Sequence, residues 1–363
     1  MKRILLFAAA ASLLMPAATA QTTQKFTASK SGEYALAYSL PRTAVDVTVE
    51  AEFTEKTPGE FYNYARRYLN IADAITAPST QLQVKSVVIG THGEADDSNR
   101  WQVQFKSGST PYMILNESGC MLSLNTDEIA DEVAVDLPVP VAAKPTPLEV
   151  PAAREAMTQE MIQSSSTSKR AELAAQRIFE LREMRSDLIS GQADNTPPDG
   201  LSLQLALENL SAQEAALTAM FAGTVKTYTR VYTATVVPDD AEDISGKVIS
   251  RISLTDGFVD ADDLSGEPVT INITAREQAS LPVNEKGEEK KFPKGGVAYT
   301  IPGTADVTVY FRDNVVARTT VDMAQQGVTF GLDPGLFTDK KAPSKLQLDP
   351  ATGAVLLLGP AGE

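Results

Sequence analysis

The side chains that most often carry out acid-base or nucleophilic chemistry are scarce in this sequence. The chain of 363 residues has one histidine, His92, and one cysteine, Cys120. A Ser-His-Asp or Cys-His site would have to use His92, yet no Gly-x-Ser-x-Gly turn accompanies it. Cys120 lies in a predicted hairpin, without a helix N-terminus to activate its thiol. We therefore interpret His92 as an exposed loop residue after the predicted strand Leu82–Thr91, and Cys120 as a buried apolar residue.

Metal binding has little support from the sequence. One histidine and one cysteine cannot supply the nitrogen and sulfur ligands of a zinc site within one chain. Two acidic stretches, Asp239–Asp243 and Asp256–Glu267, could offer oxygen ligands to calcium, but neither has the spacing of an EF-hand loop. Solvated loop acids are the alternative interpretation, and calcium binding stays open at this point. We predict no metal site and no cofactor.

Paired carboxylates are the remaining route to catalysis. A glycosidase needs two carboxylates about 5–10 Å apart in a cleft, and 47 acidic residues make such a pair available in any fold. Availability therefore carries no weight. We predict no catalytic residues and a protein that is not an enzyme, with an envelope hydrolase that acts on glycan or peptide through paired carboxylates as the alternative.

Glu214 is the polar residue with the most unusual predicted position. Apolar residues at helical spacing predict helices over Lys169–Ser190 and Leu201–Ala222, and Glu214 falls on the apolar stripe of the second. An unpaired carboxylate there would cost several kcal/mol. Arg182 and Arg185 of the first helix are the predicted partners. We interpret the three as a structural ion pair that fixes a helical hairpin, with a functional acid as the alternative.

The elements that must position these side chains form two β-rich regions with helices between them. Alternating apolar and polar residues predict the strands, one helix is inserted in the first region, and spaced prolines predict a stiff connector. The predicted organisation is a signal peptide at 1–20, a β-rich domain at 21–137, a proline-rich connector at 138–151, a helical hairpin at 152–223 and a β-rich C-terminal domain at 224–363.

A repeated pattern links the two β-rich regions. Ala37–Val49 returns as Ala298–Val309 with one residue deleted, and both copies contain a Tyr-x-aliphatic-Pro sequence. A proline inside an alternating run predicts a strand, a kink and a second strand. Both regions also end in a predicted hairpin. This predicts two β-sandwich-like domains of duplicated design, although chance similarity between β segments is the alternative.

The N-terminus and the charge indicate where the protein works. Lys2 and Arg3, the apolar run Ile4–Leu14 and the Ala18-Thr19-Ala20 site have the order of a secretory signal peptide. Gln21 follows the cleavage site, where a lipoprotein would need cysteine. The net charge of −15 at pH 7 argues against nucleic acid as a partner. We expect an exported protein of the periplasm or cell surface without a transmembrane segment or lipid anchor.

Several motifs also resemble a known family. They include Gly32-Glu33-Tyr34, Pro58-Gly59-Glu60-Phe61, Ile178-x-x-Leu181-Arg182-x-x-Arg185, Pro198-Asp199-Gly200 and Tyr299-x-Ile301-Pro302. In these motifs the chain resembles a family of secreted proteins of unknown function from Bacteroidetes-group bacteria, over nearly the whole mature chain. The resemblance implies a periplasmic or surface location in a two-membrane bacterium, and it implies no activity, cofactor or catalytic residue.

Together these observations predict an α+β, mainly β protein with two β-sandwich-like domains and a central α-hairpin. The expected function is a non-catalytic binding or structural role in the cell envelope, with an envelope protein or a glycan as partner. The use of β-sandwiches as recognition modules supports this by analogy of fold alone.

Overall fold

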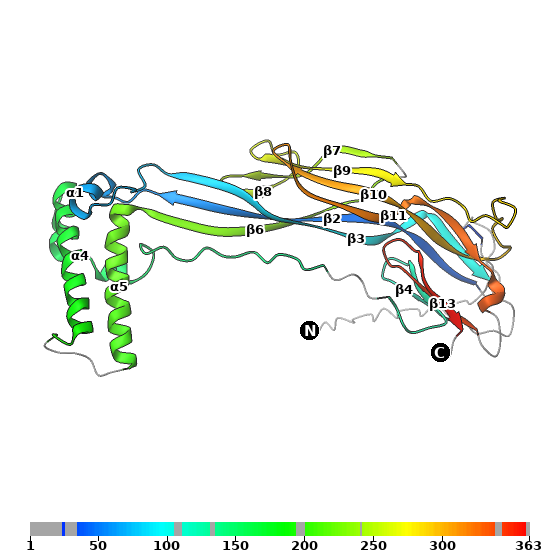
Figure 1. Cartoon of the computed structure of the whole chain (residues 1–363), viewed down its shortest axis with the longest axis horizontal. Coiled ribbons are helices and arrows are strands. Elements are labelled where there is room, and N and C mark those ends of the chain that lie inside the picture. The colour runs from blue at the N-terminus through cyan, green and yellow to red at the C-terminus, as the bar shows by residue number, and fades with distance from the viewer. Residues whose placement is uncertain are drawn as a thin grey trace, which may run out of the picture.

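The computed structural model shows an elongated molecule with a helical hairpin at one end and a small sheet at the other (Figure 1). Strands outnumber helices, so the predicted α+β, mainly β class is confirmed. The structure describes residues 24–25, 35–104, 111–130, 135–193, 200–239, 242–337 and 343–360.

Three antiparallel sheets make up the β structure of these described residues. The first has the order β1 (Gln24–Lys25), β3 (Ser79–Gln104), β2 (Ala35–Thr57) and β6 (Thr224–Val236). The second has the order β11 (Asn314–Leu332), β10 (Val297–Phe311), β9 (Glu267–Glu277), β7 (Ile244–Ser253) and β8 (Gly257–Val259). The third has the order β13 (Val355–Pro360), β12 (Ser344–Leu348), β5 (Met121–Leu124) and β4 (Met113–Leu115).

Within the described part of the chain, two helices are long and the others are short. The short ones are the 3₁₀ turns Tyr62–Tyr64 and Pro334–Phe337, α1 (Ala65–Leu69), α2 (Ala152–Glu155) and α3 (Gln159–Gln163). The long pair, α4 (Thr167–Ser190) and α5 (Leu201–Ala222), forms the hairpin. The hairpin occurs where helical spacing predicts it.

The first two sheets stack on one shared core. Alternate residues of β2 and β10 face each other across it, because a strand places successive side chains on opposite faces. Members of this core include Val47, Val49 and Phe53 from β2 and Val307 and Val309 from β10. The two β-rich regions therefore contribute the two layers of one sandwich.

The sequence predicts two separate sandwiches, one after the other. In the structure, the two β-rich regions share strands. β6 comes after the hairpin in sequence, yet it pairs with β2 from Val45↔Val236 to Thr57↔Thr224. The physical reason is that β2 has one apolar face and two hydrogen-bonding edges, and β6 satisfies the edge that β3 leaves open. The predicted domain limits thus mark changes in secondary structure, while packing crosses them.

The third sheet takes one hairpin from each β-rich region. β5 of the first hairpin pairs with β12 of the last through Leu346↔Leu124 and Gln347↔Ser123. The sheet covers a second core that contains Tyr38, Leu40 and Val297 from the starts of β2 and β10. Chain segments far apart in sequence therefore close this end of the sandwich (Figure 1).

The two copies of the repeat have the same backbone architecture. Each proline lies at a break in register, between Ser39 and Pro41 in the β2–β3 pairing and between Ile301 and Gly303 in the β10–β11 pairing. The predicted kinks are thus confirmed. Each long strand also meets the turn of its own closing hairpin: Ser39 donates its N–H to the Gly119 carbonyl and Thr300 donates its N–H to the Gly353 carbonyl, both at 3.0 Å.

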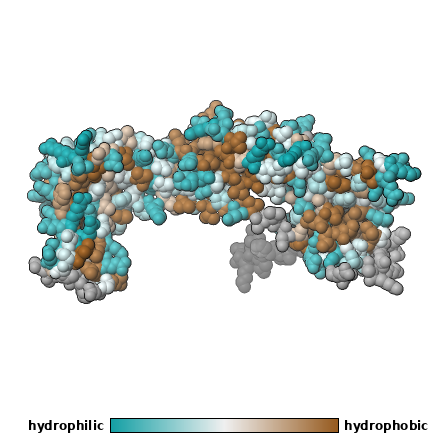
Figure 2. Space-filling view, viewed as in Figure 1, coloured by the Kyte–Doolittle hydropathy of each residue, from teal (hydrophilic) through white to brown (hydrophobic). Residues whose placement is uncertain are grey.

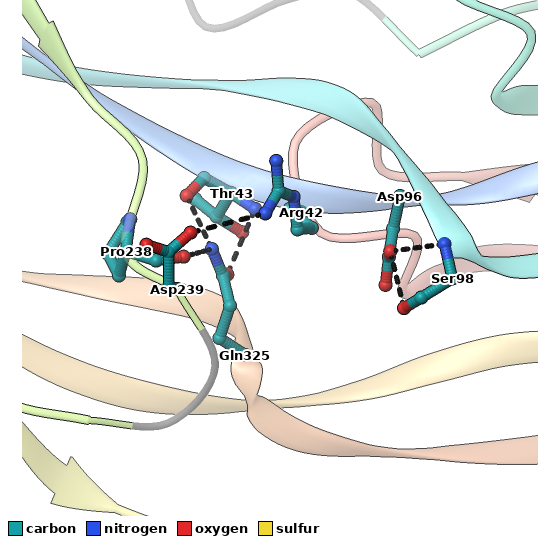
Figure 3. Close-up of polar contacts among 7 residues, drawn as sticks. All are labelled: Arg42, Thr43, Asp96, Ser98, Pro238, Asp239 and Gln325. Atoms are coloured by element: carbon teal, nitrogen blue, oxygen red, sulfur yellow. Dashed lines mark hydrogen bonds and ion pairs between the residues drawn. The ribbon is translucent and has the colours of Figure 1, made fainter.

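Thr43 and Gln325 hold the two sheets together just after the first kink (Figure 3). The Gln325 side chain accepts the Thr43 N–H at 3.0 Å and donates to the Thr43 carbonyl at 3.0 Å and to the Pro238 carbonyl at 3.2 Å. The Thr43 hydroxyl donates to the Ala351 carbonyl at 3.0 Å and accepts the Ala324 N–H at 2.9 Å. Thr43 is fully buried. It joins β2, β11 and the last hairpin turn.

The predicted connector is extended and runs along the first sheet. Val141 and Thr229 of β6 are joined by two hydrogen bonds, one from the Val141 N–H to the Thr229 hydroxyl at 2.8 Å and one from the Thr229 N–H to the Val141 carbonyl at 2.9 Å. Glu149 pairs with Lys226 at 3.1 Å. The connector thereby returns the chain from the third sheet to the hairpin end (Figure 1).

Candidate functional site on the helical hairpin

The base of the hairpin is held by a compact core of its own. Phe61, Ile178, Leu181, Leu217 and Phe221 are buried there. The rings of Phe61 and Phe221 lie 5.3 Å apart, and the Phe61 N–H donates to the Met220 carbonyl at 2.7 Å. The segment after β2 therefore anchors the C-terminal half of α5.

Local sequence sets the ends of both helices. Ser166 caps α4 by accepting the Lys169 N–H at 3.4 Å, and Gly191 ends it with a φ of 71°. Gly223 ends α5 with a φ of 87°, where a Cβ would lie 2.6 Å from the Thr57 carbonyl oxygen. A side chain there would collide with backbone. Glycine thus allows α5 to continue directly into β6.

Glu214 contacts both of its predicted partners across the hairpin. Its Oε1 lies 2.6 Å from Arg182 Nε, and its Oε2 pairs with Arg185 Nη1. The Glu214 side chain is 13% exposed, whereas those of Arg182 and Arg185 are 44% and 34% exposed. One largely buried carboxylate thus meets two cations that remain open to solvent. The geometry is that of a structural clamp between α4 and α5.

The distal half of α5 has no comparable packing. Leu201 is 70% exposed and Leu205 is 56% exposed. Leu203 and Leu207 are half-buried and line a groove of about 520 Å³ beside Gln204. These four leucines are absent from the core at the hairpin base. The helix that is buried at its C-terminal end is therefore largely uncovered at its N-terminal end.

His92 lies within β3, so the prediction of a loop residue is wrong. Strand β3 runs through Gly90 and Gly93 because antiparallel pairing with β2 continues there. His92 Nδ1 lies 2.5 Å from Asp46 Oδ2, and the Thr235 hydroxyl donates to Asp46 Oδ1 at 2.6 Å. The His92 side chain is 42% exposed. The three residues form a row across the outer face of the first sheet.

A cavity of about 270 Å³ adjoins His92 between the edges of β3 and β11. Its polar lining includes Asp322 and Asp349. Asp349 already accepts the Ala351 N–H at 3.0 Å and the Thr352 N–H at 2.7 Å, so it shapes a turn. Among the described residues, no hydroxyl or thiol hydrogen-bonds to the His92 ring. The row therefore presents no activated nucleophile within that part of the chain.

Cys120 is buried, as its apolar surroundings predict. It is 1% exposed, and burial raises the pKa of its thiol. The thiol is therefore neutral and shielded at neutral pH.

The acidic stretches have local structural roles where the structure describes them. Asp239 forms an ion pair with Arg42 (Figure 3), with 3.6 Å between the charged atoms, and Asp243 accepts the Ala275 N–H at 2.7 Å. Asp263 accepts the Ser265 N–H at 2.9 Å, which lowers the pKa of its carboxyl. Residues 240 and 241 lie outside the described part. Over the described residues, no three histidine, cysteine or acidic side chains gather as a possible metal site.

Two features were missed by the sequence analysis. The uncovered leucines could have been found, because Leu201 and Leu205 lie on the side of the helix opposite to the stripe that contains Leu203 and Leu207. The Asp46–His92 contact could not, since it depends on the register of β2 against β3.

Comparison with known proteins identifies a family for this chain. A family model described as a domain of unknown function (DUF4831) matches residues 34–356. The chain has no significant match among curated proteins or among solved structures. The match includes strands of all three sheets and the whole hairpin, and it leaves out β1 and most of β13.

Proposed function

The chain belongs to the family of the domain of unknown function DUF4831, and we propose that this member is an exported, non-catalytic binding protein of the cell envelope. In this proposal the long sandwich acts as a spacer between binding surfaces at its two ends. The observation that carries it is the uncovered apolar surface at each end of the molecule.

The first surface is the distal hairpin, and the second is the outer strand of the third sheet. Figure 2 shows apolar surface on the lower part of the hairpin and a larger apolar area at the opposite end, over the third sheet. Leu356 and Leu358 of β13 are 55% and 42% exposed. Strand β13 pairs with β12 alone among the described strands. An edge strand with apolar side chains favours partner binding.

The polar sites support a structural role over catalysis. Glu214 is neutralised by two arginines. Asp46 and His92 bind each other on an open sheet face, and Asp349 is occupied by its own turn. A hydrolase that works through paired carboxylates would use two acids that converge on a cleft and keep free oxygens for substrate.

Export rests on the N-terminal sequence. Lys2, Arg3, the apolar run and Ala18-Thr19-Ala20 support removal of the first 20 residues. Among the described residues, no helix has the length and apolar character needed to cross a bilayer. Cell fractionation with N-terminal sequencing tests this point. A mature chain that begins at Gln21 outside the cytoplasm is expected, and an uncleaved cytoplasmic chain would contradict it.

Pull-down from the native envelope tests the binding role. The mature chain, residues 21–363, is immobilised and its retained proteins and glycans are identified by mass spectrometry. Leu205→Glu and Leu356→Glu each place a charge on one surface, and we expect each to lose a different set of retained molecules. Leu264→Glu introduces the same charge at a residue that is 81% exposed between β8 and β9, and it serves as the control. No specific retention, together with turnover of a glycan or peptide library, would favour the hydrolase.

A further inference from the structure

We propose that the outer edge of β13 accepts an extended segment of a different protein as an added strand of the third sheet. The segment has about five residues with alternating apolar side chains, and lysine or arginine residues flank them. This inference rests on the proposed binding role and names the kind of partner that binds at the third-sheet end of the molecule.

The backbone of β13 is paired on one side only. β12 pairs with β13 from Ser344↔Pro360 to Leu348↔Val355, and no other described strand pairs with it. Alternate residues of β13 therefore direct their N–H and C=O groups away from β12. Another extended backbone has the matching spacing of donors and acceptors. Pro360 has no N–H, so residues 355–359 limit the added strand to about five residues.

The edge of β13 lacks the protection that the other described edges have. Shortness, charged side chains or a covering segment protect a sheet edge from unwanted pairing. β1, β4 and β8 have two or three residues each. β3 and β11 carry charged residues such as Lys85 and Arg318, and the connector binds β6 through Val141 and Thr229. β13 has six residues, and none of them is charged. Its edge is therefore suited to pairing with a partner strand.

The side chains of β13 favour an apolar strand as partner. Leu356 and Leu358 are two residues apart and are 55% and 42% exposed. They belong to the end of the molecule where Figure 2 shows the larger apolar area. Residues opposite each other on paired strands lie on the same face of the sheet. An added strand with alternating apolar residues would therefore cover these two leucines.

The charges around the third sheet favour a basic partner. Residues 111–130 and 343–360, which contain the sheet, include four acidic residues and one basic residue, Lys345. Asp127 and Glu128 are exposed. The Glu128 carbonyl accepts a hydrogen bond from the Gln347 side chain at 3.2 Å, and Gln347 lies opposite Leu357 in the β12–β13 pairing. Glu128 is thus close to the strand that neighbours the open edge. Lysine or arginine beside the apolar run of the partner would complement this charge.

A second copy of this chain fits the edge less well. Its β13 would arrive with the same acidic surroundings, and each chain has a net charge of −15 at pH 7. Like charges that meet across an interface oppose association. The complementary partner is therefore a basic segment of a different protein.

Fluorescence anisotropy with a defined peptide tests the inference. The labelled, end-blocked peptide has three valines that alternate with two threonines, and two lysines on each side. It is added to the purified mature chain, residues 21–363, and we expect saturable binding. Leu358→Lys would bury a like charge in the contact and should weaken binding about 10-fold. Leu264→Lys is the matched control and should bind normally, and circular dichroism checks that both variants are folded.

N-methylation of the peptide distinguishes backbone pairing from apolar contact. A methyl group on the amide nitrogen removes the hydrogen-bond donor. In an added strand only alternate N–H groups point to β13, so methylation of the valines and methylation of the threonines should have unequal effects. We expect one set to weaken binding about 10-fold more than the other. Equal effects would show contact through side chains alone and would overturn strand pairing.

Exchange of the flanking lysines for glutamates tests the charge of the partner. The glutamate peptide should bind about 10-fold more weakly at low salt, because it meets the acidic side chains of the third sheet. The double variant Asp127→Asn, Glu128→Gln should reduce this difference. Equal affinities of the natural chain for the two peptides would contradict a basic partner.

The outcomes separate this inference from the proposed binding role. No binding of the lysine peptide, or binding that Leu358→Lys leaves unchanged, would overturn strand addition at β13. Envelope molecules that the natural chain retains and Leu356→Glu loses would then support the binding role through another kind of contact. Peptide binding with the expected effect of N-methylation would support strand addition even if the pull-down retained nothing.

Discussion

The two copies of the repeat place the same residue types at corresponding positions and use them differently. Tyr38 of β2 is 3% exposed and donates its hydroxyl proton to the Ala298 carbonyl at 2.8 Å. The corresponding Tyr299 of β10 is half-buried, and its hydroxyl has no hydrogen bond within the described part of the chain. Thr43 forms two hydrogen bonds through its hydroxyl, whereas the buried hydroxyl of Thr304 has no partner among the described residues.

The two copies share a backbone hydrogen bond, and they differ in the hydrogen bonds of their side chains. Ser39 and Thr300 make the same backbone hydrogen bond to a glycine carbonyl in the hairpin of their own copy. This contact belongs to the repeated unit. The side-chain contacts of Tyr38 and Thr43 cross to the other copy, and the matching residues there make no such return contact. The two copies therefore have the same backbone architecture, but only the first copy supplies side-chain hydrogen bonds from these positions to the junction between them.

The largest expected difference is between Thr43→Val and Thr304→Val. Thr43→Val keeps the shape of the side chain and leaves the Ala324 N–H and the Ala351 carbonyl without their partner. Each buried unsatisfied group costs about 1–3 kcal/mol, so a loss of about 4 kcal/mol is expected. Thr304→Val removes a hydroxyl that is already unpaired and should change stability by less than about 1 kcal/mol, in either direction.

Urea unfolding followed by the fluorescence of Trp101, the only tryptophan, measures this pair. Trp101 packs against the core under the third sheet, so it reports on the junction. Equal losses for the two variants would show that the junction does not depend on Thr43.

The two hairpin glycines offer the next contrast. Gly119 has a φ of 88° with open space around it, and Gly353 has a φ of 73° with the Pro41 side chain 2.9 Å from where a Cβ would lie. Gly119→Ala should cost about 1–2 kcal/mol through the left-handed backbone alone. Gly353→Ala adds a collision with Pro41 and should cost about 3 kcal/mol. Thermal unfolding of both variants measures the difference, and a greater loss at Gly119 would contradict the assigned surroundings.

A smaller effect is expected for the tyrosine pair. Tyr38→Phe removes the buried hydrogen bond to Ala298 and should cost about 1–2 kcal/mol. Tyr299→Phe removes a hydroxyl that no described residue binds, and it should cost less than about 0.5 kcal/mol. Burial raises the pKa of Tyr38 well above its usual range. In an absorbance titration of the folded chain, Tyr38 should therefore stay un-ionised at the alkaline pH where exposed tyrosines ionise, and Tyr38→Phe should leave the number of ionising tyrosines unchanged.

The sequence predicts those parts of this molecule that depend on local pattern. Helical spacing places α4 and α5, and the cost of a lone carboxylate on an apolar stripe points from Glu214 to Arg182 and Arg185. The two prolines predict the two kinks. Each of these follows from residues that are close in sequence or from one simple energetic penalty.

The pairing of distant edges is what the sequence leaves open. Nothing in β6 indicates that it will pair with β2, because backbone hydrogen bonds are the same for every residue type. His92 has glycines on both sides and acids after it, which is typical of a loop. A Cβ at Gly93 would overlap the Pro350 carbonyl oxygen, so that glycine serves close packing against the last hairpin. The residue that requires glycine at position 93, Pro350, is more than 250 residues away along the chain.

The smallest expected effect concerns the aspartate that both copies carry after the kink. Asp306 lies beside Arg318 at 2.9 Å and Arg276 at 3.4 Å, and it accepts the Thr320 hydroxyl proton at 2.7 Å. The hydrogen bond from Thr320, with the two arginines, lowers the pKa of its carboxyl. The corresponding Asp46 has other neighbours: it lies 2.5 Å from the His92 ring and accepts the Thr235 hydroxyl proton at 2.6 Å.

Because the pKa of Asp306 is lower in the folded chain than in the unfolded chain, its ionised form favours the folded state. This contribution is complete above the unfolded value of about 4 and is lost as the pH falls through the folded pKa. Asp306→Asn removes it, so the urea midpoint should fall less steeply below pH 5 in the variant than in the natural chain. The loss should also shrink in 1 M salt, since these groups are partly exposed. If Asp46→Asn changed the fall of the urea midpoint below pH 5 in the same way, the two aspartates would contribute equally to stability in acid. The difference between the two copies would then be confined to the buried hydroxyls at the junction.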